Sequence, residues 1–97
     1  MNHHESLDLI RRTGVIAIMR TRSSDQLLRA ADAIRAGGVC AIEVTMTTPG
    51  ALGVIEQAAA RAEEGVLFGA GTVLDGESAR AAILAGAQFV VSPAFKP

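Results

Sequence analysis

Cysteine, lysine and long apolar runs are all scarce in this sequence of 97 residues. The single cysteine, Cys40, excludes an internal disulfide and a four-cysteine zinc site. No run of 18 apolar residues is present, so we expect no membrane-spanning segment. The first residues are polar, unlike the basic head and apolar middle of a secretory signal. A cytoplasmic, soluble protein is therefore the expectation.

Excess charge is also absent, since the formal net charge is only -1. A nucleic-acid-binding domain is expected to carry a basic face, so we expect no nucleic-acid partner. Lys96 is the single lysine, which leaves one candidate for a lysine nucleophile. The histidines are limited to His3 and His4, and two adjacent histidines do not complete a metal-binding shell. We therefore expect no metal.

The composition that remains is that of a globular domain. Hydrophobic residues make up 49% of the chain and charged residues 20%, a balance unlike that of disordered chains. The length suits one domain, so residues 1–97 are treated as a single unit.

Four short apolar runs are spaced evenly along this unit. They lie at residues 14–20, 40–45, 65–70 and 88–92. Each run is continuous rather than alternating, which favours strands that are covered on both faces of a parallel sheet. The segments between them have residues at helical spacing that predict the buried face of a helix. These are Leu27, Ala31 and Ile34 in the first segment, Ala51, Ile55, Ala58, Ala59 and Ala62 in the second, and Ala79, Ala82, Ile83 and Gly86 in the third.

Capping signals mark the ends of the expected helices. A short first helix is expected at about residues 5–12, with Asn2 as its cap. Ser23 and Gln26 have the spacing of a capping box, and Asp75 can cap the last helix. Thr48 followed by Pro49 predicts a fourth cap, with proline in the first helical position.

The predicted order is one helix, then four strands with a helix between each pair. Ile16, Ile42, Leu67 and Phe89 are 26, 25 and 22 residues apart, which indicates a repeat of strand–helix units. This α/β pattern with parallel strands fits an open doubly wound sheet or a closed (β/α)8 barrel. Four strands are half of the number that a barrel needs.

In both architectures, functional residues gather at the carboxyl ends of the strands. Glu43 interrupts an apolar strand, which suggests a general acid/base or, alternatively, a structural carboxylate paired with an arginine. Arg20 follows the first strand and could clamp a carboxylate or phosphate, pair with Glu43, or lie in solvent. Thr72 offers a hydroxyl beside a glycine turn, and Ser92 with Pro93 suits a pocket wall.

Two motifs, one for dinucleotide binding and one for a hydrolase nucleophile, are incomplete in this sequence. Residues 69–72 resemble part of a dinucleotide fingerprint, but Leu74 stands where the third glycine is required. Ser92 lacks the G-x-S-x-G surroundings of a hydrolase nucleophile. Because the sequence contains no phosphate loop, a small open-sheet ligand-binding domain is a weaker alternative.

Four segments of the sequence form a specific combination in their order and spacing. They read GVIAIMR at 14–20, AGGVCAIEVTMTTPGAL at 36–52, GAGTVL at 69–74 and AGAQFVVSP at 85–93. Together they resemble the 2-keto-3-deoxy-6-phosphogluconate (KDPG) and 4-hydroxy-2-oxoglutarate (KHG) aldolase family. The resemblance implies the N-terminal half of a (β/α)8 TIM barrel, with the domain at 1–97 ending after its fourth strand. It implies a homo-oligomer, usually a trimer.

The resemblance also implies the chemistry. Members cleave a 2-keto-4-hydroxy acid to pyruvate and an aldehyde, through a Schiff base on a lysine. No cofactor or metal is implied, because the iminium takes up the electrons. Glu43 matches the catalytic glutamate. Substrate binding is implied for Arg20 and Thr72 at the pyruvate carboxylate, for Pro93 in the pocket wall, and for Thr47 where some members carry an arginine.

The family's lysine lies on a later strand, beyond residue 97, and Lys96 does not match it. We therefore expect this chain alone to be inactive or nearly so. The alternative is a non-catalytic half-barrel that dimerises or pairs with a separate C-terminal half. The resemblance leaves the KDPG, KHG and phosphogalactonate substrates open.

Overall fold

The computed structural model describes residues 2–20, 23–61 and 65–93. Helices and strands alternate along the chain as predicted. In chain order they are α1 (His3–Thr13), β1 (Ile16–Met19), α2 (Ser24–Ala36), β2 (Ala41–Thr45), α3 (Ala51–Arg61), β3 (Leu67–Gly71) and α4 (Gly76–Ala85). Lys96, and Ala62 on the predicted face of the third helix, lie outside the described residues.

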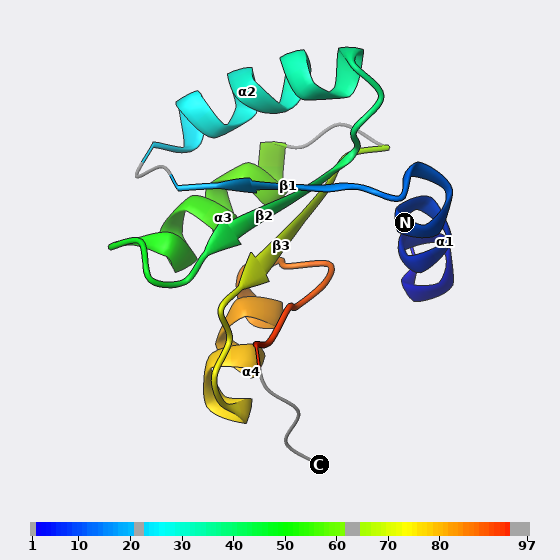
Figure 1. Cartoon of the computed structure of the whole chain (residues 1–97). Helices are drawn as coiled ribbons and strands as arrows, with labels where there is room; N and C mark the ends of the chain where they lie inside the picture. Colours follow the sequence, from blue (N-terminus) through cyan, green and yellow to red (C-terminus); the bar gives the residue numbers. More distant parts are fainter. Residues whose placement is uncertain (1, 21–22, 62–64, 94–97) are drawn as a thin grey trace.

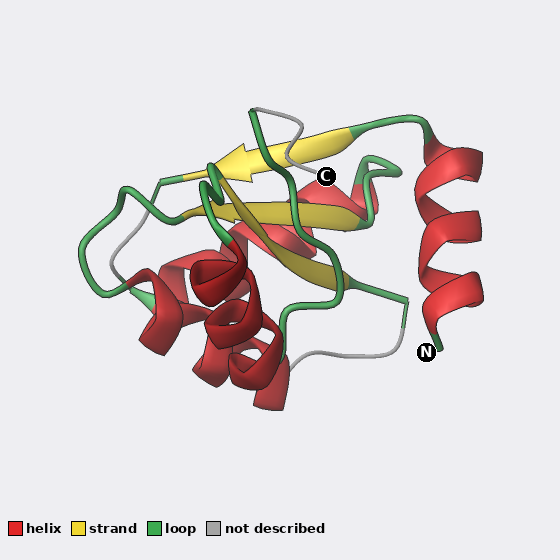
Figure 2. Cartoon of the chain, turned by 90° about the horizontal axis from the view of Figure 1, so that it is seen from below, coloured by secondary structure: helices red, strands yellow, loops and turns green. Residues whose placement is uncertain are grey.

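The strands form one parallel sheet in the order β1-β2-β3. Ile18 pairs with Glu43 across the first two strands, and Glu43 pairs with Gly69 across the next two. Helices gather on one side of the strands, and the N-terminal helix lies apart from them (Figure 2). Figure 1 shows α1 beyond the ends at which the strands begin.

Alternation along each strand divides the sheet into two faces. Ile42, Val44, Phe68 and Ala70 belong to the core that also contains Leu27 of α2 and Ile55 of α3. The opposite face, called here the inner face, carries the other parity of each strand. Its residues are Ile16, Ile18, Ala41, Glu43, Thr45, Leu67, Gly69 and Gly71.

Three of the predicted helix caps are confirmed. The side chain of Asn2 accepts a hydrogen bond from the backbone N–H of Glu5, and Ser23 accepts one from Gln26. Asp75 accepts from the N–H of Ser78 at 2.7 Å. Each cap satisfies a backbone donor that the first helical turn leaves without a partner.

The predicted cap at Thr48 and Pro49 is wrong. Helix α3 begins at Ala51, and the N–H of Ala51 bonds to the carbonyl of Thr48 in a turn that precedes the helix. Gly50, between them, has φ +77°, a left-handed conformation that interrupts the helix and that glycine adopts at little cost. The turn therefore shifts the start of the helix by two residues.

The predicted fourth strand at 88–92 is also wrong as a regular strand. Within the described residues it is reduced to a single parallel bridge between Ala70 and Val90. The N–H of Gln88 still bonds to Phe68, and that of Val91 to Ala70, both at 2.8 Å. No described strand lies on the outer side of this segment, so pairing is limited to one neighbour.

Helix α4 departs from prediction on one face. Ala82 is fully buried as its spacing predicts, but Ile83 is 59% exposed and Leu84 is 74% exposed. The helix packs against α3, and that contact uses the alanine side of α4. The two larger apolar side chains therefore stay outside the core.

Candidate active site

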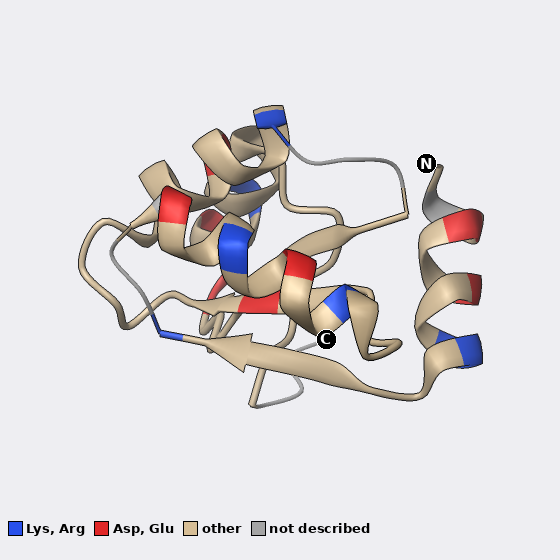
Figure 3. Cartoon of the chain, turned by 90° about the horizontal axis from the view of Figure 1, so that it is seen from above, with Lys and Arg blue, Asp and Glu red and all other residues tan. Residues whose placement is uncertain are grey.

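Glu43 is the only charged residue within the three described strands. It lies in the middle of β2 and is only 7% exposed. Most of the other acidic and basic residues lie on the helices, as Figure 3 shows. A carboxylate at such a position costs free energy unless it is paired or performs a function.

No described residue forms a hydrogen bond or an ion pair with the Glu43 carboxylate. The ion pairs of Arg12 with Asp8 and of Arg61 with Asp25 lie on the surface. The alternative of a structural carboxylate paired with an arginine therefore receives no support. Burial raises the pKa of Glu43 above its ordinary value of 4.5, because desolvation disfavours the charged form. A carboxyl with a raised pKa is better suited to donate a proton as well as to accept one.

Gly71 provides the space into which Glu43 extends. A Cβ atom placed on residue 71 would overlap the carboxyl group of Glu43 and lie 2.6 Å from its Cγ. Gly71 is the register partner of Thr45, two residues beyond Glu43 on the same face. The Glu43 side chain therefore leans toward the carboxyl end of the strands.

Phe89 packs on the same face. A Cβ on Gly69 would lie about 2.5 Å from atoms of the Phe89 ring, so the ring rests directly on the β3 backbone. Gly69 is also the register partner of Glu43. Glycines at 69 and 71 thus make room for two side chains at once, one aromatic and one acidic.

Arg20 directly follows β1 and is exposed. It continues the alternation that places Ile18 on the inner face, at the end of the sheet toward which Glu43 leans. A guanidinium there suits the recognition of a carboxylate or phosphate.

The predicted threonines follow the ends of the next two strands. Thr47 is exposed in the turn after β2, and Thr72 is half-buried immediately after β3. Thr72 has φ +59°, and it is the only residue other than glycine with a positive φ in the described ranges. Such a conformation is strained for a β-branched residue, and strain of this kind gathers at functional sites.

Pro93 and Ser92 are exposed after the segment that bonds to β3. The structure thus brings Arg20, Thr47, Thr72 and Pro93 to the same end of the sheet, with Glu43 leaning toward that end. Their roles as substrate-binding residues remain predictions.

The sequence prediction assigned no role to Thr45 or Phe89. Thr45 is 3% exposed, and its hydroxyl has no hydrogen-bond partner within the described part of the chain. Its position two residues after Glu43 was a usable signal, because residues i and i+2 share a face of a strand. Phe89 had no such signal, because its contact with Gly69 depends on how the segment after α4 runs beside β3.

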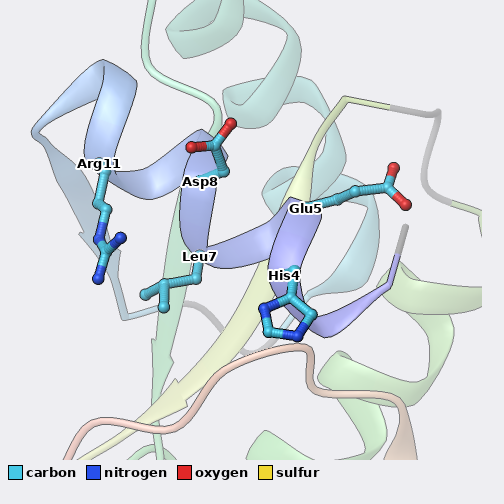
Figure 4. A pocket seen from close by; sticks show the side chains of 5 residues that line it. All are labelled: His4, Glu5, Leu7, Asp8 and Arg11. Atoms are coloured by element: carbon cyan, nitrogen blue, oxygen red, sulfur yellow. The ribbon is translucent and has the colours of Figure 1, made fainter.

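A separate pocket of about 370 Å³ lies against α1. His4, Glu5, Leu7, Asp8 and Arg11 line it, all from successive turns of that helix (Figure 4). It is at the end where the strands begin, whereas sites of parallel α/β proteins lie at the carboxyl ends. No described group of three or more metal-ligating side chains is present, there or elsewhere.

A family model described as KDPG and KHG aldolase matches residues 7–97. The chain belongs to the KDPG and KHG aldolase family. The match spans every described strand and the carboxyl-end residues, so the family resemblance seen in the sequence is confirmed.

Curated members of the family are similar over nearly the whole chain. The 2-dehydro-3-deoxy-phosphogluconate aldolase of Treponema pallidum is 45% identical over 95 residues, covering 96% of this chain and 42% of that protein. The KHG/KDPG aldolase of Escherichia coli is 36% identical over 93 residues, covering 95% of this chain and 43% of that protein. The chain therefore spans about two fifths of the length of these relatives.

Solved structures of KDPG aldolases share the fold. The enzyme of Zymomonas mobilis, crystallised with 3-phosphoglycerate, aligns with a TM-score of 0.80 at 30% identity, covering 98% of this chain and 44% of that one. The Legionella pneumophila enzyme, with pyruvate captured as a covalent carbinolamine, aligns with a TM-score of 0.75 at 32% identity over 84% of this chain and 39% of that one. The predicted α/β fold, part of a TIM barrel, is confirmed.

Within the described ranges, no helix combines the length and the apolar character that crossing a membrane requires.

Proposed function

We propose that this chain supplies the acid/base and part of the pyruvate pocket of a class I aldolase. The observation that carries the proposal is the buried Glu43, which extends over Gly71 on the inner face with no partner among the described residues. Membership of the KDPG and KHG aldolase family supports the same role.

The proposed reaction cleaves KDPG to pyruvate and glyceraldehyde 3-phosphate, or KHG to pyruvate and glyoxylate. A lysine amine adds to the C2 carbonyl, and water leaves to form an iminium. A base then takes the proton of the C4 hydroxyl, the C3–C4 bond breaks, and its electron pair moves into the iminium. Glu43 donates and accepts the protons of these steps, as its raised pKa favours.

Arg20 and Thr72 are proposed to hold the carboxylate of the keto acid, and Pro93 to form part of the pocket wall. Thr47 stands where some members carry an arginine, so Arg20 would supply more of the charge recognition here. The exposed guanidinium beyond β1 and the strained backbone beside Gly71 support this arrangement.

No residue of this chain matches the family's Schiff-base lysine. We propose that the 97-residue chain alone is inactive or nearly so, because its one lysine, Lys96, does not match. Borohydride reduction in the presence of pyruvate, followed by mass spectrometry, tests this. We expect no adduct, with a full-length KHG/KDPG aldolase as positive control. A stoichiometric adduct at Lys96 would contradict the proposal.

A chimera tests the role of Glu43. Residues 1–97 would be joined to the part of the Treponema pallidum relative that they do not span, and pyruvate release from KDPG and KHG would be measured. We expect cleavage, and a loss of about 100-fold or more in Glu43→Gln. Glu56→Gln, at an exposed position of α3, is the matched control. A folded Glu43→Gln chimera with full activity would refute the assignment.

Residues 1–97 are proposed to form part of one (β/α)8 domain of a cytoplasmic homo-oligomer, a trimer in the family's usual form. The comparisons do not favour the alternative of a non-catalytic half-barrel, because the relatives reported above are named as aldolases.

A further inference from the structure

Thr45 combines two properties that are rarely found together. Thr45 is 3% exposed, and its hydroxyl oxygen is buried without a hydrogen-bond partner in the described structure. A buried hydroxyl without a partner destabilises a protein, so the great majority of such groups are paired. The hydroxyl also has no room for a water molecule beside it, because neighbouring atoms cover it almost completely.

The Glu43 carboxyl lies level with Thr45 on the inner face. Gly71 is directly opposite Thr45 in the register of β2 and β3, and the Glu43 carboxyl fills the position of a Cβ on residue 71. Side chains directly opposite one another on parallel strands are about 5 Å apart at Cβ. The carboxyl and the hydroxyl are therefore neighbours across this short gap.

We propose that the Thr45 hydroxyl is the hydrogen-bond donor that holds the ionised Glu43 carboxylate over Gly71. A rotation about the Cα–Cβ bond of Thr45 exchanges its methyl and hydroxyl groups and turns the donor toward the carboxylate. Thr45 is thus a positioning residue, which acts through Glu43 and not on the substrate. Its consequence for catalysis rests on the proposed function, but the contact itself does not.

The surroundings of Glu43 leave Thr45 as a specific donor. Its register partners, Ile18 and Gly69, are uncharged, and the described segment after α4 adds no charged residue. Arg20 continues the same alternation on β1 and is the charged group to consider beside the hydroxyl. An arginine contact would persist when the Thr45 hydroxyl is removed, so the two contributions can be separated.

The test is a titration of Glu43 by carbon NMR in the 97-residue chain with 13C-labelled glutamate carboxyl groups. The Glu43 signal is assigned by its loss in Glu43→Gln. We expect Thr45→Val, which keeps the shape but removes the donor, to lower the ratio of ionised to neutral Glu43 at a given pH by about tenfold. Thr45→Ser, which keeps the hydroxyl, is expected to restore the wild-type ratio.

A second measurement needs no variant of Thr45. In the wild-type chain, the Thr45 methyl signal is expected to shift with the same midpoint as the Glu43 carboxyl. The proposal is overturned if Thr45→Val titrates like the wild type, or if the Thr45 methyl signal does not follow Glu43. Neither result depends on catalysis, so an inactive chimera would count against the proposed function and leave this contact standing.

Discussion

The ring of Phe89 rests on the backbone of Gly69, a contact that only a residue without a side chain permits. Ring atoms lie about 2.5 Å from where a Cβ of residue 69 would be. The contact holds the segment after α4 against β3, beside the bridge between Ala70 and Val90. The ring also covers the inner face of the sheet beside Glu43, because Glu43 pairs with Gly69 in register.

Gly69→Ala is expected to destabilise the chain by about 1–3 kcal/mol, because the new methyl group forces the ring away. Urea denaturation followed by circular dichroism measures the change. Phe89→Leu in the same chain relieves the overlap, so the double variant is expected to lose less stability than the sum of the two single variants. Additive losses would show that the ring and the glycine are not in contact.

Gly71→Ala is expected to destabilise the chain by about 1–3 kcal/mol, because the methyl group takes the place of the Glu43 carboxyl. In the chimera, Gly71→Ala is also expected to reduce the rate of cleavage, as Glu43→Gln does. Gly53→Ala is the matched control. Gly53 lies within α3, and apart from its chain neighbours and the backbone of its own helix no atom lies within 4 Å of its missing Cβ, so alanine is expected to stabilise the helix by about 0.5–1 kcal/mol. Equal changes in stability from Gly71→Ala and Gly53→Ala would contradict the packing of Glu43 over Gly71.

The raised pKa of Glu43 predicts a pH-dependent stability. The folded chain holds the Glu43 proton more tightly than the unfolded chain, so this residue lowers stability as the pH rises above about 4.5 toward the folded value. Glu43→Gln removes that contribution, so its stability relative to the wild type is expected to increase from pH 4 to pH 7. Parallel urea curves at both values measure it, with Glu56→Gln as control. A constant difference between Glu43→Gln and the wild type would refute the burial effect.

Asp75→Ala is expected to lower the free energy of unfolding by about 1 kcal/mol, because it removes the acceptor of the Ser78 N–H at the start of α4. Asp75→Asn keeps an acceptor at the same position and is expected to retain most of that stability. Thermal unfolding of the three chains measures the difference. An asparagine variant as unstable as the alanine variant would show that charge, rather than the cap bond, matters here.

Local patterns predicted most of the fold, because they depend on neighbours in the sequence. Ser23 and Asp75 marked helix starts, since a capping side chain bonds to an N–H three residues away. The same kind of reasoning failed at Thr48, where the left-handed Gly50 delays the helix. It failed again at Ile83, because helical spacing does not reveal which side of α4 meets α3.

For the candidate site, the sequence alone determined that a carboxylate interrupts a buried strand, that Arg20, Thr47 and Thr72 follow strand ends, and that Pro93 follows the last apolar run. The family resemblance, confirmed by comparison, gave these residues their expected roles. Only the tertiary structure decided that Glu43 fills the space over Gly71 and lies level with Thr45, and that Phe89 covers Gly69. The physical reason is register: strand pairing joins residues about 26 positions apart, and no local periodicity specifies which of them lie opposite one another.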